Sequence, residues 1–412
     1  MTQVAILGWY GSPNIGDEAE LAAILAHLAA WPRPPRVVVF STQPGRTRAQ
    51  YRSYPGGLAV LPRNPLAPAA LRTLRGSRLL ILGGGGLIQD QTSIYNLPLF
   101  TLFGLLARGL GCPLQWWGVG VEPLVTPLGR AQARLLVRLA APGGVSVRDA
   151  NSRRLLVRAG VPAPAVRVSA DPASATPPAA WATVRPLLPA AGDLESGRPW
   201  IAFCLRDLPN NPRGSGPGYL LPVAAQKKVG LAGQHTQAHA RRAEAFYALL
   251  AQAADHLIAT HGARVLFLPF WWGRDDQIAA LVRGQMRHAD QTVALDGALT
   301  PAQARAILGR MDLVVAVRLH ALIFGAAAGV PGIGFSYAQK IRAFMQRTGQ
   351  GARVLDLQHL TWPALQATLD QAWAGRVSAR PALLAQAAIL QAAVAQDAAV
   401  AARLSCGQRL VP

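Results

Sequence analysis

Short apolar runs rich in β-favouring residues alternate with helix-like stretches along most of this chain, and this alternation limits the possible folds more than any other feature. Strands that are apolar on both faces and separated by helices are typical of parallel sheets covered by helices on both sides. The alternation therefore predicts a doubly wound α/β structure. The predicted strands are Val4–Leu7, Val37–Phe40, Leu79–Leu82, Gln115–Val119, Val145–Val147, Val166–Ser169, Ile201–Leu205, Val265–Leu268, Leu313–Val317 and Gly332–Phe335.

A Pro- and Ala-rich stretch, Asp171–Pro199, interrupts the alternation and has the composition of an interdomain linker. A chain of 412 residues is long enough for two domains. We therefore expect two Rossmann-like domains, over residues 1–180 and 181–380, with a cleft between them. A helix over residues 381–412 can pack back on the first domain, and the Gly- and Pro-rich stretch Arg206–Thr236 is predicted to be a long loop.

The clearest predicted helix is Asp17–Ala30, in which Leu21, Ile24, Leu25 and Leu28 form one apolar stripe. Its first turn holds three acids, and negative charge there suits the positive end of the helix dipole. These acids are Asp17, Glu18 and Glu20.

The chain carries 41 Lys and Arg against 20 Asp and Glu, a formal net charge of +21. The basic residues do not cluster on one element together with aromatic residues, so nucleic acid is not expected as a partner. An anionic membrane surface or a phosphorylated substrate fits the charge better. A general bias toward arginine is the alternative explanation, because only three of the basic residues are lysines.

The cysteine content points to a reduced, intracellular protein without a structural metal, because Cys112, Cys204 and Cys406 form neither a disulfide framework nor a metal-ligand pattern. The N-terminal sequence MTQVAILGWYG lacks the basic segment of a signal peptide. Polar residues interrupt the Ala-rich tail from Ala382 to Leu404, so we predict no transmembrane helix.

Ligands of doubly wound sheets bind beyond the carboxyl ends of the strands, so polar residues that directly follow a predicted strand are candidate site residues. The sharpest candidate is the run Gly83–Gly86. Its backbone N–H groups can approach an anion or a sugar closely, or it forms a tight turn without a ligand. Neither a GxGxxG dinucleotide pattern nor a GxxxxGK[ST] phosphate loop is present, so a nicotinamide cofactor is not expected.

His320 and Lys340 follow consecutive strands of one strand–helix–strand unit, so we expect both at the same sheet edge, within about 10 Å of each other. A structural histidine and a surface lysine are the alternatives. Arg318 has the position of a more structural residue that pairs with a carboxylate.

Five segments together resemble the polysaccharide pyruvyl transferase family, most closely its CsaB-type branch, from about residue 4 to about residue 348. They occur in the family's order and spacing, and their order is more specific than any one of them. The segments are GWYGSPNIGDEAEL, GGGGLIQD, SVRDANSRRLL with its downstream SADPA, FLPFWWGRDD, and VRLHALIFGAAAGVP with its downstream SYAQK.

The resemblance implies a GT-B-like architecture of two Rossmann-like domains. It also implies transfer of the enolpyruvyl unit of phosphoenolpyruvate to two hydroxyls of a sugar, which yields a cyclic pyruvate ketal. For the CsaB-type branch, the implied acceptor is an N-acetylmannosamine residue of a lipid-linked cell-wall polymer precursor, and the product anchors S-layer proteins. Phosphoenolpyruvate would be a co-substrate, with no further cofactor or metal.

The resemblance assigns His320, Lys340 and Arg148 to the phosphoenolpyruvate site, with His320 as the catalytic acid. Ala338 and Gln339 stand where the family usually has Asp and Pro, which leaves the conformation of this loop open. Asp17 is the candidate base, or a first-turn helix residue without a catalytic role. Further donor-site candidates are Arg318 and Arg206, and acceptor or loop candidates are Gly84, Gly85, Gly86, Gln89, Asp90 and Asn14.

The chief alternative is a GT-B glycosyltransferase with a nucleotide-sugar donor, because the fold alone does not separate the two reactions. A lipid-linked amino-sugar acceptor requires work at the membrane. We expect a cytoplasmic protein that associates peripherally with the anionic inner face of the cytoplasmic membrane, through basic surface that includes the arginine-dense segment from Arg46 to Arg78.

Overall fold

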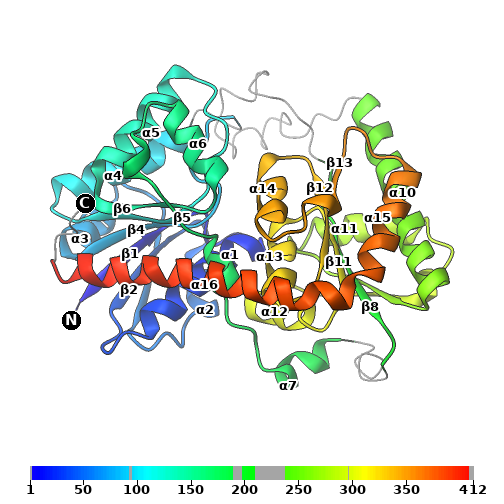
Figure 1. The fold of residues 1–412 in the computed structure, drawn as a ribbon. Coiled ribbons are helices and arrows are strands. Elements are labelled where there is room, and N and C mark those ends of the chain that lie inside the picture. The colour runs from blue at the N-terminus through cyan, green and yellow to red at the C-terminus, as the bar shows by residue number, and fades with distance from the viewer. Residues whose placement is uncertain (1, 92–94, 189–196, 209–236, 296, 408–412) are drawn as a thin grey trace.

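The structure, a computed structural model, contains two parallel β-sheets, each covered by helices (Figure 1). It describes residues 2–91, 95–188, 197–208, 237–295 and 297–407. The two sheets have equivalent strand orders, in which the third, second and first strands are followed by the fourth, fifth and sixth. This order defines a Rossmann-like sheet, so the predicted doubly wound α/β class is confirmed.

The first sheet has the order β3-β2-β1-β4-β5-β6-β7, and its strands pair in parallel. Successive residues of a strand point to opposite faces. Ala5 and Leu7 accordingly pack toward α3, α4 and α5, whereas Val4 and Ile6 pack toward α1. The strands are β1 (Gln3–Leu7), β2 (Arg36–Ser41), β3 (Leu58–Pro62), β4 (Leu79–Gly83), β5 (Leu114–Val119), β6 (Ala140–Val147) and β7 (Arg167–Val168). The helices are α1 (Ile15–Ala29), α2 (Pro44–Gln50), α3 (Pro68–Gly76), α4 (Asn96–Gly109), α5 (Pro127–Leu139) and α6 (Ala150–Arg158).

The second sheet has the order β10-β9-β8-β11-β12-β13 and is also parallel. Ala202 and Val314 face the layer with α12 and α13, while Ile201 and Val315 face α10, α11 and α15. The strands are β8 (Trp200–Cys204), β9 (Arg264–Phe267), β10 (Thr292–Ala294), β11 (Leu313–Ala316), β12 (Gly332–Ser336) and β13 (Val354–Asp356). The helices are α10 (Gln237–His261), α11 (Asp275–Arg283), α12 (Pro301–Leu308), α13 (Leu319–Ala327), α14 (Gln339–Arg347) and α15 (Trp362–Ala374).

The segment between the two sheets runs from the end of β7 to the start of β8 and carries short helical turns. These are η2 (Pro172–Ala175), α7 (Trp181–Val184) and η3 (Arg185–Leu187). Of the predicted loop Arg206–Thr236, residues 209–236 lie outside the described residues.

The last helix, α16 (Arg376–Ser405), runs from the second domain back across the first (Figure 1). Leu390 and Val394 join the apolar layer beneath the first sheet. Asp397 is fully buried, forms an ion pair with Arg167 and accepts a hydrogen bond from Gln115 through its carbonyl oxygen at 2.9 Å. Within the described part of the chain, α16 is the one helix with the length and composition of a membrane span. One third of its apolar window, 33%, is buried inside the protein.

Candidate functional site

The N-terminus of α1 lies at the boundary between the two domains. The backbone N–H of Ile15 donates a 2.8 Å hydrogen bond to the carbonyl of Phe270, and Asn14 forms an isolated antiparallel bridge with Trp271. Asn14, an acceptor-site candidate, also caps α1 by accepting a hydrogen bond from the N–H of Gly16. The first turn of α1 is therefore fixed against the second domain.

Of the three acids predicted for this turn, Asp17 and Glu18 lie in it, whereas Glu20 lies in the next turn because α1 begins at Ile15. The three acids have different surroundings. The carboxylate of Asp17 accepts a 2.7 Å hydrogen bond from Asn14. Glu18 is buried and accepts hydrogen bonds from the N–H of Gly11 at 2.7 Å and from the hydroxyl of Tyr51 at 3.2 Å. Glu20 points toward the second domain. A common role at the helix dipole therefore does not describe these acids, because their side chains are engaged in separate networks.

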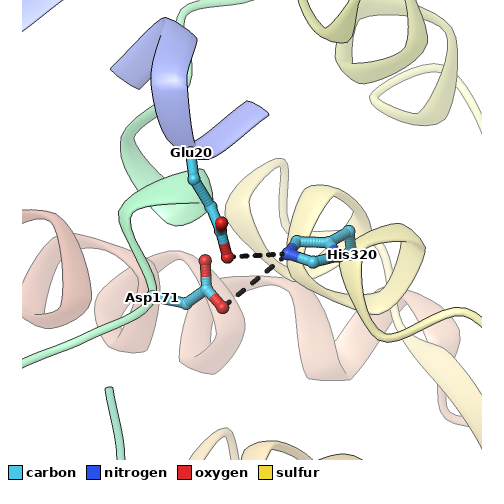
Figure 2. Close-up of side chains that lie close together, drawn as sticks. All are labelled: Glu20, Asp171 and His320. Atoms are coloured by element: carbon cyan, nitrogen blue, oxygen red, sulfur yellow. Dashed lines mark hydrogen bonds and ion pairs between the residues drawn. The ribbon is translucent and has the colours of Figure 1, made fainter. Parts of the chain in front are cut away.

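Glu20 and Asp171 converge on His320, which lies in the first turn of α13 (Figure 2). The Nε2 atom of His320 is 3.3 Å from Oε1 of Glu20 and 3.8 Å from Oδ2 of Asp171. The imidazole also packs against Gly16, where a Cβ atom would lie 2.1 Å from Nδ1. Only glycine leaves room for the ring at this point, so the sequence of α1 sets the position of a histidine from the other domain.

Burial shifts the pKa values of the two contacting groups in opposite directions. It raises the pKa of Glu20 well above its ordinary value, and the nearby Asp171 and Asp17 add to this shift. Burial lowers the pKa of His320, although Asp171 and Asp17 oppose the effect. Burial therefore favours the neutral form of both side chains.

Asp171 adds an unsatisfied acceptor to this cluster. Its Oδ2 atom is buried and accepts no hydrogen bond from the described residues, but it lies 3.6 Å from Nη1 of Arg148. The ligand atoms of Glu20, Asp171 and His320 lie within 4.8 Å of one another, a spacing that a metal ion could also use. In this structure the guanidinium of Arg148 supplies positive charge beside the carboxylate.

The predicted glycine turn faces the side chain of Glu20. Gly84 and Gly85 have φ values of +63° and +69°, and the N–H of Gly85 donates to Glu20. A Cβ atom on Gly84 would lie 2.4 Å from Oε2 of Glu20. Of the backbone groups expected to approach a substrate, the N–H of Gly85 is thus bound to the Glu20 side chain and the N–H of Gly84 to the carbonyl of Trp117.

A second cluster joins Arg148 and Lys340 through Glu122, a residue that the sequence analysis did not single out. Oε1 of Glu122 lies 3.0 Å from Nζ of Lys340 and 3.8 Å from Nη2 of Arg148. Burial alone would raise the pKa of Glu122, but Lys340 and Arg148 outweigh it and hold this pKa below the ordinary value. Arg148 is 5% exposed and contacts Asp171 as well, so it links this cluster to the one around His320.

Two other donor-site candidates bind side chains of the protein. Arg318 was a donor-site candidate, but it pairs with the buried Asp275 through Nε at 2.9 Å, the structural alternative that its sequence position also allowed. Arg206 donates to the hydroxyl of Tyr337 at 2.8 Å.

Asp90 was expected at the acceptor site, and in the structure it binds the segment that precedes α5, whose N-cap is Thr126. It accepts hydrogen bonds from the N–H groups of Val125 at 2.7 Å and Thr126 at 2.9 Å. Gln89, the adjacent candidate, is buried.

A small cavity lies beside Arg148, Asp171 and Lys340. It has a volume of about 20 Å³, roughly the room for one water molecule. Arg347 of α14 also crosses it and donates to the carbonyl of Arg148 at 2.9 Å. The cavity is lined by Arg148, Asp149, Asp171, Ser174, Leu319, Ile323, Lys340, Phe344, Arg347 and Leu390.

Two Rossmann-like domains with a polar site between them define the GT-B-like class, and solved structures support this fold. The chain is similar to HepE from Anabaena in complex with UDP-glucose, with a TM-score of 0.53, 12% identity and 99% of each chain covered. It is also similar to MnaA from S. aureus with UDP, with a TM-score of 0.57, 8% identity and coverage of 96% of this chain and 94% of that one. A putative UDP-N-acetylglucosamine 2-epimerase from Listeria monocytogenes matches with a TM-score of 0.55, 9% identity and coverage of 98% and 96%.

The sequence identifies the family within this class. The family model of polysaccharide pyruvyl transferases matches residues 14–339, most of the chain, and the protein belongs to this family. In a sequence search of curated proteins, none matches the chain significantly.

Proposed function

We propose that this protein forms a cyclic pyruvate ketal on a sugar, with phosphoenolpyruvate as the donor. The observation that carries the proposal is the adjacency of an acid–base cluster and a cationic cluster, joined by Arg148 at the junction of the two domains. Phosphoenolpyruvate needs both, because it is a trianion whose methylene carbon must be protonated.

The cations suited to the donor are Arg148 and Lys340. Arginine offers a planar fork for a carboxylate or phosphate, whereas lysine offers a compact charge. Burial opposes the charge of Lys340, but Glu122 outweighs this effect and keeps the pKa of Lys340 above its ordinary value. Both side chains therefore remain cationic at neutral pH.

The acid in the proposed reaction is the contacting pair of Glu20 and His320. The pair donates a proton to the methylene carbon of phosphoenolpyruvate, and the double-bond electrons form the new C–H bond. This leaves an oxocarbenium-like carbon, which the first sugar hydroxyl attacks. The second hydroxyl then displaces phosphate, so that two C–O bonds to the sugar replace the C=C π bond and the C–O bond to phosphate.

Asp17 is the candidate base for an acceptor hydroxyl. Burial raises the pKa of Asp17, while His320 and the hydrogen bond that Asp17 accepts from Asn14 oppose this shift. A raised pKa makes a carboxylate a better proton acceptor. Asn14, which donates this hydrogen bond, also caps α1 and forms a bridge with Trp271 of the second domain. The position of Asp17 is therefore fixed at the domain boundary.

For the acceptor we propose the CsaB-type reaction, in which an N-acetylmannosamine residue of a lipid-linked cell-wall polymer precursor receives the pyruvate and later anchors S-layer proteins. Such a substrate implies peripheral work at the inner face of the cytoplasmic membrane. The excess of basic over acidic residues, with a net charge of +21, supports attraction to an anionic surface. The proposed reaction uses no cofactor.

The competing function is sugar transfer from a nucleotide-sugar donor. It is favoured by the fold similarity to HepE and MnaA, which were solved with UDP-glucose and with UDP. Incubation of the protein with labelled phosphoenolpyruvate or a labelled nucleotide sugar, each with a lipid-like disaccharide acceptor, separates the two. Acceptor-dependent release of inorganic phosphate from phosphoenolpyruvate supports pyruvyl transfer. Release of a nucleoside diphosphate without inorganic phosphate contradicts it.

A further inference from the structure

We propose that Glu122 is a built-in competitor of the donor, a carboxylate that holds Lys340 and Arg148 until an oxyanion of phosphoenolpyruvate displaces it. This inference rests on the proposed function for the identity of the donor. It rests on the geometry of the site for the displacement itself.

Glu122 already makes the contacts that a donor oxyanion would make. Its Oε1 atom lies 3.0 Å from Nζ of Lys340 and 3.8 Å from Nη2 of Arg148. Its other oxygen, Oε2, accepts a 2.9 Å hydrogen bond from the amide of Gln91, which holds the carboxylate in this orientation. Lys340 and Arg148, the two residues assigned to the donor, are thus both in contact with the Glu122 carboxylate.

An oxyanion of the donor cannot take the position of Oε1 between the two cations while Glu122 is in place. The small cavity on another side of Lys340 and Arg148 is not lined by Glu122 and has a volume of about 20 Å³, enough for roughly one water molecule. Phosphoenolpyruvate carries a carboxylate and a phosphate and is far larger than water. Binding of a donor oxyanion to both cations at the position of Oε1 therefore requires that the Glu122 carboxylate leave them.

The contact also connects the two domains. Glu122 follows β5 of the first domain, where the neighbouring Val121 forms a bridge with Ile88, whereas Lys340 is on α14 of the second domain. An oxyanion that binds Lys340 in place of Glu122 removes this direct ion pair between the domains. Donor binding is thereby coupled to the strength of the contact across the cleft.

Removal of the charge of Glu122 should tighten the binding of oxyanions. In Glu122→Gln the side chain keeps its size and its ability to accept from Gln91, but it no longer neutralises the cations. We expect the dissociation constants of inorganic phosphate and of phosphoenolpyruvate, measured by titration calorimetry on the full chain, to fall roughly tenfold. The matched control is Glu244→Gln, which changes an exposed glutamate on α10 and should leave both constants unchanged.

The opposite result overturns the proposal. If Glu122→Gln binds phosphate with unchanged or weaker affinity, Glu122 positions Lys340 and does not compete with the donor. Glu122→Asp provides a second variant if the first does not fold: its shorter side chain retracts the carboxylate from Lys340, and tighter phosphate binding is again expected. Unchanged or weaker binding by this variant contradicts the proposal equally.

The competitor role of Glu122 and the pyruvyl transfer activity can be contradicted independently of each other. Tighter phosphate binding by Glu122→Gln, without turnover of phosphoenolpyruvate in any form of the protein, supports the competitor and contradicts pyruvyl transfer. Turnover of phosphoenolpyruvate with no gain in affinity in Glu122→Gln supports pyruvyl transfer and contradicts the competitor.

Discussion

The Nε2 atom of His320 lies 3.3 Å from Oε1 of Glu20, so an imidazole of the second domain contacts a carboxyl group of the first. Neither residue can act on a substrate without the other nearby. Burial raises the pKa of Glu20 and lowers that of His320, so it favours the neutral form of both side chains. The proposed acid–base pair therefore requires contact between the two domains.

Replacement of His320 should remove most of the catalytic rate. A general acid contributes on the order of 10²–10⁴-fold, so His320→Gln should lower kcat by about this factor while thermal stability stays near that of the wild type. The assay is acceptor-dependent phosphate release. His359→Gln, at an exposed position, is the control and should be fully active. A near-normal rate in His320→Gln would show that the acid is another residue.

Replacement of Glu20 should move the pH dependence. The pair is active while it carries its proton, so the rate should fall as pH rises through the pKa of the pair. In Glu20→Gln only the imidazole can carry the proton, and its pKa is lowered by burial. The falling limb of kcat against pH should therefore move to lower pH. A limb at the same pH in both proteins would exclude Glu20 from the acid.

Loss of either donor-site cation should weaken donor use. Only Lys340→Ala isolates this effect, because Arg148→Ala should also lower stability. Lys340→Ala should raise the KM for phosphoenolpyruvate, because a charge-assisted bond contributes roughly 1.5–3 kcal/mol. Lys340→Arg should restore binding only in part, since a planar fork does not reproduce a compact ammonium group.

Arg148→Ala should weaken donor use and also lower stability, because Arg148 is 5% exposed and contacts Asp149, Asp171 and Glu122. Breaking a buried pair costs about 3–5 kcal/mol. Thermal unfolding beside the kinetics separates the two effects. Wild-type kinetic constants in both alanine variants would place the donor elsewhere.

Glu18 should make the protein less stable as pH rises through the neutral range. Burial raises its pKa from 4.5 to about 7, so the folded state binds a proton that the unfolded state has lost between these values. The stability from this group is complete below pH 4.5, and roughly 2–4 kcal/mol of it is lost by about pH 7. In Glu18→Gln this loss should disappear from urea unfolding curves measured across the range. Parallel pH profiles for the variant and the wild type would contradict the burial argument, and Glu244→Gln is the control.

Membrane attraction should depend on exposed arginines of the first domain. Each basic residue near an anionic surface contributes about 1 kcal/mol, and salt screens the attraction. The exposed Arg72, Arg75 and Arg78 lie on and directly after α3. Their combined replacement by alanine should reduce sedimentation with anionic vesicles, whereas replacement of the exposed Arg241 and Arg242 on α10 should not. Binding that is insensitive to salt, or absent at low salt, would remove the proposed surface.

The sequence was sufficient for the alternation of strands and helices, but it missed three of the four edge strands. The missed strands are β3, β10 and β13, and each lies at a sheet edge. Thr292–Ala294 and Val354–Asp356 have only three residues each, and Leu58–Pro62 ends in proline. Such strands carry a weak periodic pattern, because only one neighbour and a few side chains define them.

The site was predicted less completely than the fold, for a different reason. His320, Lys340 and Arg148 follow strand ends, a position that the linear sequence reveals. Glu20 carries no such signal, because it lies in the second turn of a helix. Glu122 follows the predicted strand Gln115–Val119 by three residues, so it carries the same signal as His320, although the sequence analysis did not single it out. Their partners lie in the other domain or in a distant loop, so their importance follows only from contacts across the cleft.

The position of α16 has a consequence for the order in which the protein can fold. Chains are synthesised from the N-terminus, and domains commonly fold as they emerge. Here Leu390 and Val394 complete the apolar layer that also contains Val4 and Ile6 of the first strand. The apolar core of the first domain is therefore complete only after the last helix has left the ribosome. Until then, α1 alone covers this face of the sheet and Arg167 lacks its buried partner, so a chain released early would expose apolar surface that can associate with other chains.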